Sequence, residues 1–144
     1  MKRALYILTA VTLGAAAPAA AGDMLYPGGT MLTENLEGRP YWAVQARCAG
    51  VYGATSNFLA DKGDTDGAAE AKAMGVAFFN IAVDRVMKDR GIERRAALEA
   101  LSPGVIAGRQ ETIEVLQAEG DGPSSTWNYA RSVCLDIRDS YGAP

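Results

Sequence analysis

Residues 41–60 read YWAVQARCAGVYGATSNFLA, and the spacing within this stretch decides the fold. Its mostly apolar positions recur at steps of three and four residues, which is the period of an amphipathic α-helix. They are Tyr41, Val44, Cys48, Val51, Tyr52, Thr55 and Leu59. A row of small residues lies beside this stripe and consists of Ala46, Gly50, Gly53 and Asn57. A glycine inside a helix costs about 1 kcal/mol relative to alanine, so we expect a neighbouring helix to approach this row closely.

The segment 68–90 has the same period. Its apolar residues cover more than one side of the helix, which is typical of a helix with several neighbours. We therefore expect this helix at the centre of the bundle. Thr65 or Asp66 can cap its start, and Gly91 stands where a helix C-terminus favours a left-handed residue.

The next helical segment is interrupted. Ser102-Pro103-Gly104 predicts a break between a short helix at 93–101 and a longer one at 105–119, because proline lacks the N–H group that the next turn would use. The longer piece carries Ile106, Ile113 and Leu116 as its apolar positions, with Val115 alongside.

The last helix starts at a Ser125 cap and runs to Tyr141. Its apolar stripe has steps of three and four residues and consists of Trp127, Ala130, Cys134, Ile137 and Tyr141. No segment of the chain predicts a strand of persuasive length. Four helical units with short connections indicate an all-α fold, a small antiparallel helical bundle of four to five helices.

The N-terminus predicts export. Lys2 and Arg3 precede an uncharged, mostly apolar stretch, and small residues follow up to Ala21, which is the layout of a secretory signal peptide. The stretch is about 14 residues long, shorter than the roughly 20 that a membrane-spanning helix needs, so cleavage is favoured over an uncleaved anchor. We expect a signal peptide at 1–21, an extended N-terminal arm at 22–40 and a helical domain at 41–144, located in the periplasm or secreted.

Cys48 and Cys134 are the two cysteines of the chain, and each lies on the apolar stripe of its helix. The first and last helices of an up-down bundle are commonly neighbours, and an exported chain enters an oxidising compartment. We therefore expect a structural disulfide between them. The alternatives are two buried free thiols or a redox pair, and the second is disfavoured because the chain has no Cys-x-x-Cys motif.

The composition excludes several kinds of chemistry. The chain has no histidine, which removes Ser-His-Asp and Cys-His catalysis, histidine-ligated zinc and histidine-ligated haem. Asp64, Asp66 and Gly67 fit the middle of a calcium loop, but Lys62 and Ala73 stand at its two ends, where carboxylates are needed. We expect no metal and no cofactor.

The charge also limits the partners. Removal of residues 1–21 takes away Lys2 and Arg3 and no acidic residue, so the net charge falls from −3 to −5. An acidic domain with scattered basic residues is not typical of a nucleic-acid binder, and no apolar segment after the signal predicts a membrane span.

Three functional hypotheses remain. The first is a non-catalytic periplasmic or secreted binding protein that holds an envelope protein or a small apolar ligand in an inter-helix groove or on its N-terminal arm, with Tyr41, Trp42 and Tyr129 as candidate contact residues. The second is a chaperone resembling periplasmic acid-stress chaperones, whose 17 acidic residues would respond to pH. The third is a carboxylate-dependent enzyme, which no pair of residues singles out.

Overall fold

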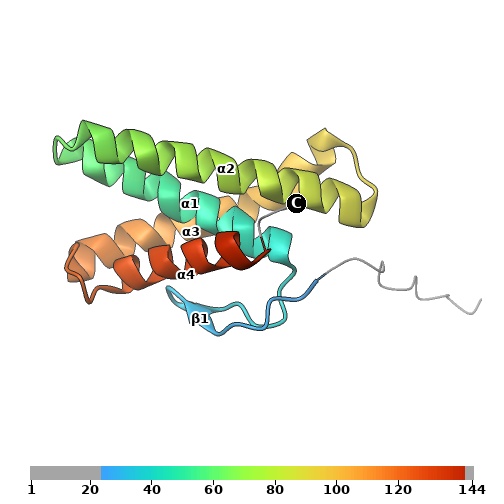
Figure 1. The fold of residues 1–144 in the computed structure, drawn as a ribbon, viewed down its shortest axis with the longest axis horizontal. Helices are drawn as coiled ribbons and strands as arrows, with labels where there is room; N and C mark the ends of the chain where they lie inside the picture. The colour runs from blue at the N-terminus through green and yellow to red at the C-terminus, as the bar shows by residue number, and fades with distance from the viewer. Residues whose placement is uncertain (1–23, 142–144) are drawn as a thin grey trace, which may run out of the picture.

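The computed structural model describes residues 24–141, so the expected signal peptide at 1–21 lies outside the described residues. The fold is mostly helical, and the chain reverses direction from each helix to the next (Figure 1). Its elements are β1 (Thr30–Met31), β2 (Glu34–Asn35), α1 (Tyr41–Asp61), α2 (Thr65–Arg90), α3 (Arg94–Glu119) and α4 (Thr126–Tyr141). No helix in residues 24–141 is long and apolar enough to cross a membrane.

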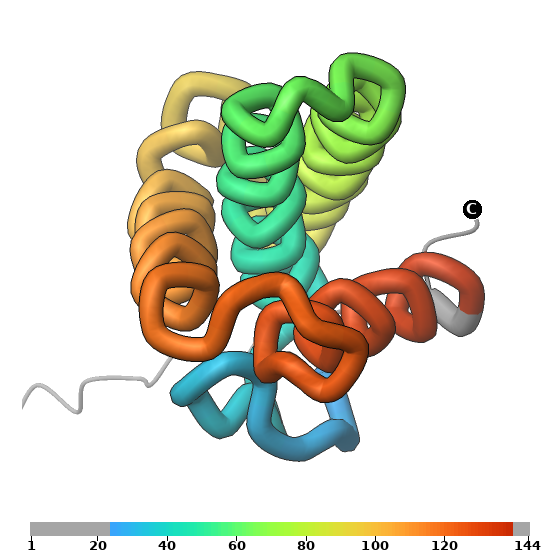
Figure 2. The backbone as a smooth tube through the Cα atoms, turned by 90° about the vertical axis from the view of Figure 1, so that its left-hand side faces the viewer, coloured from blue at the N-terminus to red at the C-terminus, as the bar shows by residue number. Residues whose placement is uncertain are grey.

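The central helix is α1, so the expectation that the second helix lies at the centre is wrong. Every residue from Val44 to Tyr52 is buried. Figure 2 shows α1 between α2 and α3, with α4 and the hairpin below it. The reason lies in charge, because Arg47 is the sole charged residue of the stretch 41–60, whereas α2 carries charged residues toward both of its ends, at 66–72 and at 84–90. A helix with one charged side chain can be surrounded, but a helix with many keeps a solvated face.

The small residues of α1 allow α3 to approach it closely. A Cβ atom at Gly50 would overlap the carbonyl oxygen of Val105 and lie 2.7 Å from the backbone nitrogen of Arg109. On the opposite side of the contact, a Cβ atom at Gly108 would overlap the carbonyl oxygen of Arg47. The expected close approach is therefore present at Gly50. Gly53 differs, because nothing lies within 4 Å of a Cβ atom built there.

The expected break at Pro103 is absent, and α3 is a single helix from Arg94 to Glu119. Proline inside a helix costs about 3 kcal/mol through the lost hydrogen bond and a clash with the preceding turn. Pro103 is exposed, so water can reach the turn that it disrupts. Packing on both sides of it compensates, because Leu101 and Gly108 are both buried and extend one continuous face against the core.

The capping residue of α2 also differs from expectation. The Asp64 carboxylate accepts a hydrogen bond from the Gly67 N–H at 2.9 Å, so Asp64 caps the helix in place of Thr65 or Asp66. At the other end Gly91 has a φ of 62°, the left-handed conformation expected there. The acidic turn before α2 thus supplies a helix cap.

The N-terminal arm forms a short antiparallel hairpin, in which Met31 pairs with Glu34. Leu32 stands in the turn with a φ of 55°, a conformation that costs a non-glycine residue about 1 kcal/mol. Burial of Leu32 and its neighbour Met31 offsets this cost, because both side chains join the core. The sequence carries no Asn-Gly or Gly turn signal here, which is why the hairpin was not expected.

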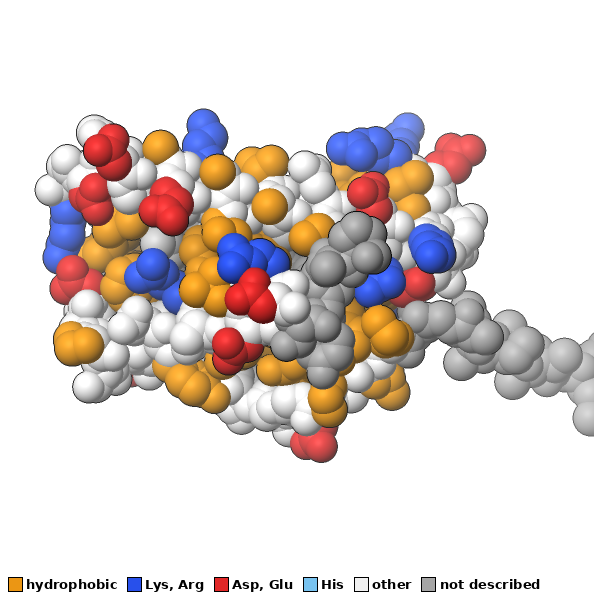
Figure 3. Space-filling model, in the orientation of Figure 1, with side chains coloured by type: hydrophobic (Ala, Val, Ile, Leu, Met, Phe, Trp, Pro, Cys, Tyr) orange, Lys and Arg blue, Asp and Glu red, His pale blue; other side chains and the backbone are white. Residues whose placement is uncertain are grey.

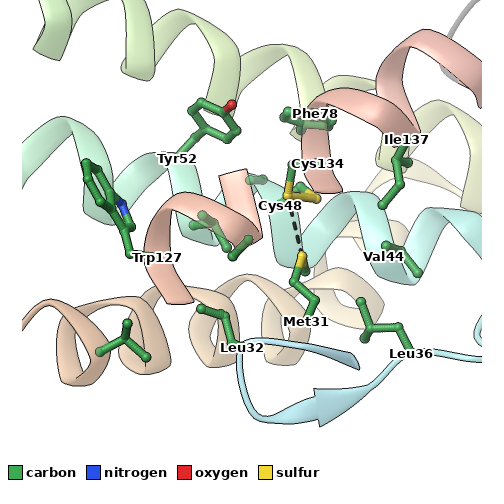
Figure 4. Packing of buried hydrophobic residues seen from close by; sticks show 14 of the residues in the cluster. Met31, Leu32, Leu36, Val44, Cys48, Tyr52, Phe78, Trp127, Cys134 and Ile137 are labelled. Atoms are coloured by element: carbon green, nitrogen blue, oxygen red, sulfur yellow. Dashed lines mark hydrogen bonds between the residues drawn. A yellow bond between two sulfur atoms is a disulfide. The ribbon is translucent and has the colours of Figure 1, made fainter. Parts of the chain in front are cut away.

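The expected disulfide is present between Cys48 of α1 and Cys134 of α4, with a Cα–Cα distance of 5.6 Å. Figure 4 shows it at the centre of the core, with Phe78 and Ile137 nearby and Met31 beneath it. The Met31 Sδ atom lies 3.7 Å from the Cys134 Sγ atom, so the bond links two helices at the point where the hairpin covers them.

Removal of this disulfide will destabilise the protein. The double variant Cys48→Ala/Cys134→Ala should lose about 2–5 kcal/mol of unfolding free energy, because the bond closes a long loop and restricts the unfolded chain. Urea denaturation with and without a reductant measures the difference. The urea midpoint of the variant should not change when the reductant is added. An equal midpoint for the variant and the oxidised wild type would contradict a stabilising role of the disulfide.

The two glycines of α1 should respond in opposite ways to one added methyl group. Gly50→Ala should destabilise by about 1–3 kcal/mol, because its Cβ meets backbone atoms of α3 that cannot rotate away. Gly53→Ala should stabilise by about 0.5–1 kcal/mol, because its Cβ enters open space and alanine favours the helix. Thermal and urea unfolding of both variants test this pair, and an equal effect at the two positions would show that α3 does not approach at Gly50.

Candidate functional site

The aromatic residues singled out in the sequence do not form one site. Tyr41 and Trp42 at the start of α1 are both buried, and the Arg90 guanidinium lies 4.5 Å from the centre of the Trp42 ring. Tyr129 on α4 is 59 % exposed. Trp42 lines a cavity with Leu101, whereas Tyr129 lines a different one beside the start of α4.

The cavity beside Trp42 has a volume of about 210 Å³, and an ion-pair cluster forms its polar side. The buried Arg47 side chain pairs with Glu34 of β2 and with Glu111 of α3. Glu34 also accepts from Arg39 at 2.7 Å, and Glu111 accepts from the Thr33 hydroxyl at 2.9 Å. This cluster ties the hairpin to α1 and α3.

Burial alone would raise the pKa of the Glu111 carboxyl, but hydrogen bonds from Arg47 and Thr33 outweigh it and hold that pKa below its ordinary value of 4.5. Glu111 is therefore ionised at neutral pH and bound to the hairpin. The basic and acidic side chains of the cluster pair with one another, which indicates a structural role for the cluster in the folded protein.

A larger cavity lies between α2 and α3, over the small residues of α1. Its volume is about 470 Å³. Its floor comes from α1 and its walls from the two flanking helices, and its lining consists of Ala49, Gly53, Ser56, Asn57, Lys72, Gly75, Val76, Phe79, Val105 and Arg109. The absence of a side chain at Gly53 leaves room between the helices, because nothing lies within 4 Å of a Cβ atom built there.

A second cavity of about 340 Å³ continues from the first, and the two share Asn57. It lies between the last turns of α1 and α3 and is lined by Ala54, Asn57, Phe58, Asp61, Ile113, Leu116 and Gln117. We call the two cavities together the α2–α3 groove. It follows α1 from Ala49 to Asp61, a length of about 18 Å at 1.5 Å per residue.

Apolar side chains stand exposed in and beside this groove. Val76 on the α2 wall is 53 % exposed, and Ile113 on the α3 wall is 38 % exposed. Ile106 follows the lining residue Val105 on α3 and is 51 % exposed. Large apolar residues gathered along one groove, rather than scattered singly, are typical of an interaction surface.

The apolar positions read from the sequence of α3 are not its buried face. Ile106 and Ile113 are exposed, and the buried face of α3 consists of Ala97, Leu101, Gly108, Thr112 and Val115. Ile106 and Ile113 are seven residues apart, so they lie on one side of the helix, outside the face that Gly108 packs against α1. The signal in the sequence was this spacing, together with the small residue Gly108 on the face that meets α1.

Another face of the molecule carries a second furrow, between α2 and α4. Figure 3 shows apolar side chains there, interspersed with charged ones. The cavity in this furrow, about 370 Å³, is lined by Leu59, Met74 and Leu135 together with Asp64, Glu70 and Arg131. None of the exposed large apolar residues of the described chain lines it, so the α2–α3 groove is the stronger candidate.

The α2–α3 groove offers contacts rather than catalytic groups. The Ser56 hydroxyl donates to the Ala68 carbonyl oxygen at 2.8 Å and so joins α1 to α2. Within residues 24–141 no three carboxylate, cysteine or histidine side chains lie close enough together to hold a metal ion. The groove can bind an apolar surface and place the positive charges of Lys72 and Arg109 beside it.

Comparisons with known proteins do not identify a family for this chain. No family model, curated protein or solved structure matches the chain. The function is therefore inferred from the groove and from the residues that line it.

Proposed function

We propose that this chain is a non-catalytic binding protein of the periplasm or the extracellular space, and that its α2–α3 groove takes up the apolar surface of a protein partner. The disulfide between Cys48 and Cys134 supports an oxidising location, because such bonds persist outside the cytoplasm. The expected signal peptide supports the same location.

The observation that carries the proposal is the exposure of Val76 and Ile113, which line an open groove with a floor of small residues. The exposed Ile106 adds to this surface, since it follows the lining residue Val105. Exposure of these side chains to water is unfavourable by roughly 25 cal/mol for each Å² of apolar surface, and a partner that covers them removes that cost. The shape favours a protein partner over a small ligand, because small-ligand sites enclose most of their ligand and this groove is open along its length.

Site-specific photo-crosslinking tests the groove. A benzophenone amino acid at Val76 or Ile106 should form adducts with one partner protein in cells that make this chain, because both positions are exposed beside the groove. The control position is Asp136, which is exposed on α4 and lies outside the groove. Mass spectrometry identifies the adducts.

Gly53→Leu sharpens this test, because its side chain projects into the groove from a position with nothing within 4 Å of the Cβ atom. The adducts at Val76 and Ile106 should disappear in the Gly53→Leu background and persist with Gly53→Ala. Equal adducts from Asp136, or adducts that survive Gly53→Leu, would reject the groove as the binding surface.

One observation favours a second function, that of an acid-responsive chaperone. The ion pairs of Arg47 with Glu34 and Glu111 hold the hairpin over the core, and the hairpin covers it with Met31 and Leu32. Protonation of the Glu111 carboxyl would weaken the attachment and expose apolar surface to a client protein.

The cluster predicts a specific dependence of stability on pH. The folded pKa of Glu111 is lowered, so its stabilisation is complete above the ordinary value of 4.5 and is lost as pH falls through the folded value. Glu111→Gln should therefore cost about 1–3 kcal/mol at pH 7 and much less at pH 3. Urea denaturation at both pH values measures the gap, with the exposed Glu114→Gln as the control.

The chaperone function requires more than this difference in stability between pH 7 and pH 3. Circular dichroism should show loss of compact structure at pH 3, together with protection of a model client from aggregation. An unchanged structure at pH 3 would reject the chaperone function and leave the binding function intact.

A further inference from the structure

Two basic side chains line the α2–α3 groove. Lys72 comes from α2 and Arg109 from α3, and both border the same cavity as Gly53 and Val76. Neither side chain makes an ion pair or a hydrogen bond with any residue in 24–141. Arg47, by contrast, pairs with two carboxylates.

The cavity around Lys72 and Arg109 has no acidic residue in its lining. The chain has 17 acidic and 14 basic residues, yet no carboxylate lines the cavity that contains Lys72 and Arg109. Asp61 lines the adjoining cavity, near the end of α1. The middle of the groove therefore combines apolar walls with a local positive charge in a protein that is acidic overall.

We propose that the partner segment in this groove is an amphipathic α-helix that carries Asp or Glu at the border of its apolar stripe. This inference rests on the proposed function, since it specifies what the α2–α3 groove binds. Carboxylates at that border would pair with Lys72 and Arg109, while the apolar stripe covers Val76, Ile106 and Ile113.

The dimensions of the groove suit a helix. Its length of about 18 Å corresponds to about 12 residues, or three turns. Packed helices have axes 8–10 Å apart, and the shorter distance needs small residues at the contact. Ala49 and Gly53 lie one turn apart on the floor and supply such residues.

The test uses two designed helical peptides. Both carry a leucine stripe at helical spacing, and the stripe is bordered by glutamate in one peptide and by lysine in the other. Fluorescence anisotropy gives the Kd of each, and circular dichroism reports helix formation. The wild-type protein should bind the glutamate peptide about tenfold more tightly at low salt, and the difference should shrink in high salt because exposed ion pairs are screened.

A charge swap provides the decisive arm. Lys72→Glu/Arg109→Glu should reverse the preference and favour the lysine peptide. The matched control is Lys88→Glu/Arg94→Glu, which makes the same change in net charge at exposed positions outside the groove and should keep the wild-type preference. Equal Kd values for the two peptides with the wild type, or an equal effect of both double variants, would overturn the inference.

Gly53→Leu separates this inference from the proposed function. If both peptides bind equally and Gly53→Leu blocks both, the groove remains the binding surface and the acidic partner is wrong. If neither peptide binds, or Gly53→Leu blocks neither, the proposed function fails as well. Tighter binding of laurate than of either peptide would identify a small amphiphile, and dimerisation that Gly53→Leu abolishes would identify a second copy of this chain. Either result would overturn the inference.

Discussion

The backbones of α1 and α3 approach so closely at Gly50 and Gly108 that a Cβ atom at either position would overlap a carbonyl oxygen of the opposite helix. This contact fixes α3 against one side of α1. The disulfide from Cys48 fixes α4 on another, and α2 packs through Gly75, whose added Cβ would lie 3.3 Å from the Ala49 carbonyl oxygen. All three helices are positioned by contacts with α1, so the stability of the bundle depends on this helix. It carries one charged residue within the stretch 41–60.

That one charge links the core to the N-terminal hairpin. Arg47 is buried, and removing a guanidinium from water is costly unless carboxylates pair with it. Glu111 of α3 and Glu34 of the hairpin supply them, so the hairpin completes the electrostatics of the core as well as its apolar packing. The same arrangement couples the attachment of the hairpin to the ionisation of Glu111. The proposed binding surface lies elsewhere, because the groove uses the face of α1 that carries Gly53 rather than the face near Cys48.

The helical fold, the disulfide and the close approach at Gly50 could be predicted. The fold follows from the three- and four-residue period, the disulfide from two cysteines on the apolar stripes of the first and last helices together with the expected export, and the close approach from the cost of a glycine inside a helix. The width of a helix's apolar face alone did not identify the central helix. The decisive feature was the number of charges that each helix must keep in water. Pro103 shows a local rule that packing overrides, since buried residues on both sides hold α3 together. The hairpin turn at Leu32 lacks any turn signal, and its conformation is stabilised by contacts distant in sequence. The candidate site was missed for a related reason. Trp42 was a candidate contact residue but lies in the core, whereas Ile113 lines the groove and Ile106 is exposed next to the lining residue Val105.

The account rests on α1 as the buried axis around which the other elements are arranged. Native-state hydrogen exchange of the oxidised protein tests this most directly, because the slowest amides open only when the whole domain unfolds. The amides from Val44 to Tyr52 should exchange most slowly and with the free energy of global unfolding, while those of α2 should exchange faster through local opening. Slowest exchange in α2, with α1 opening locally, would contradict the account.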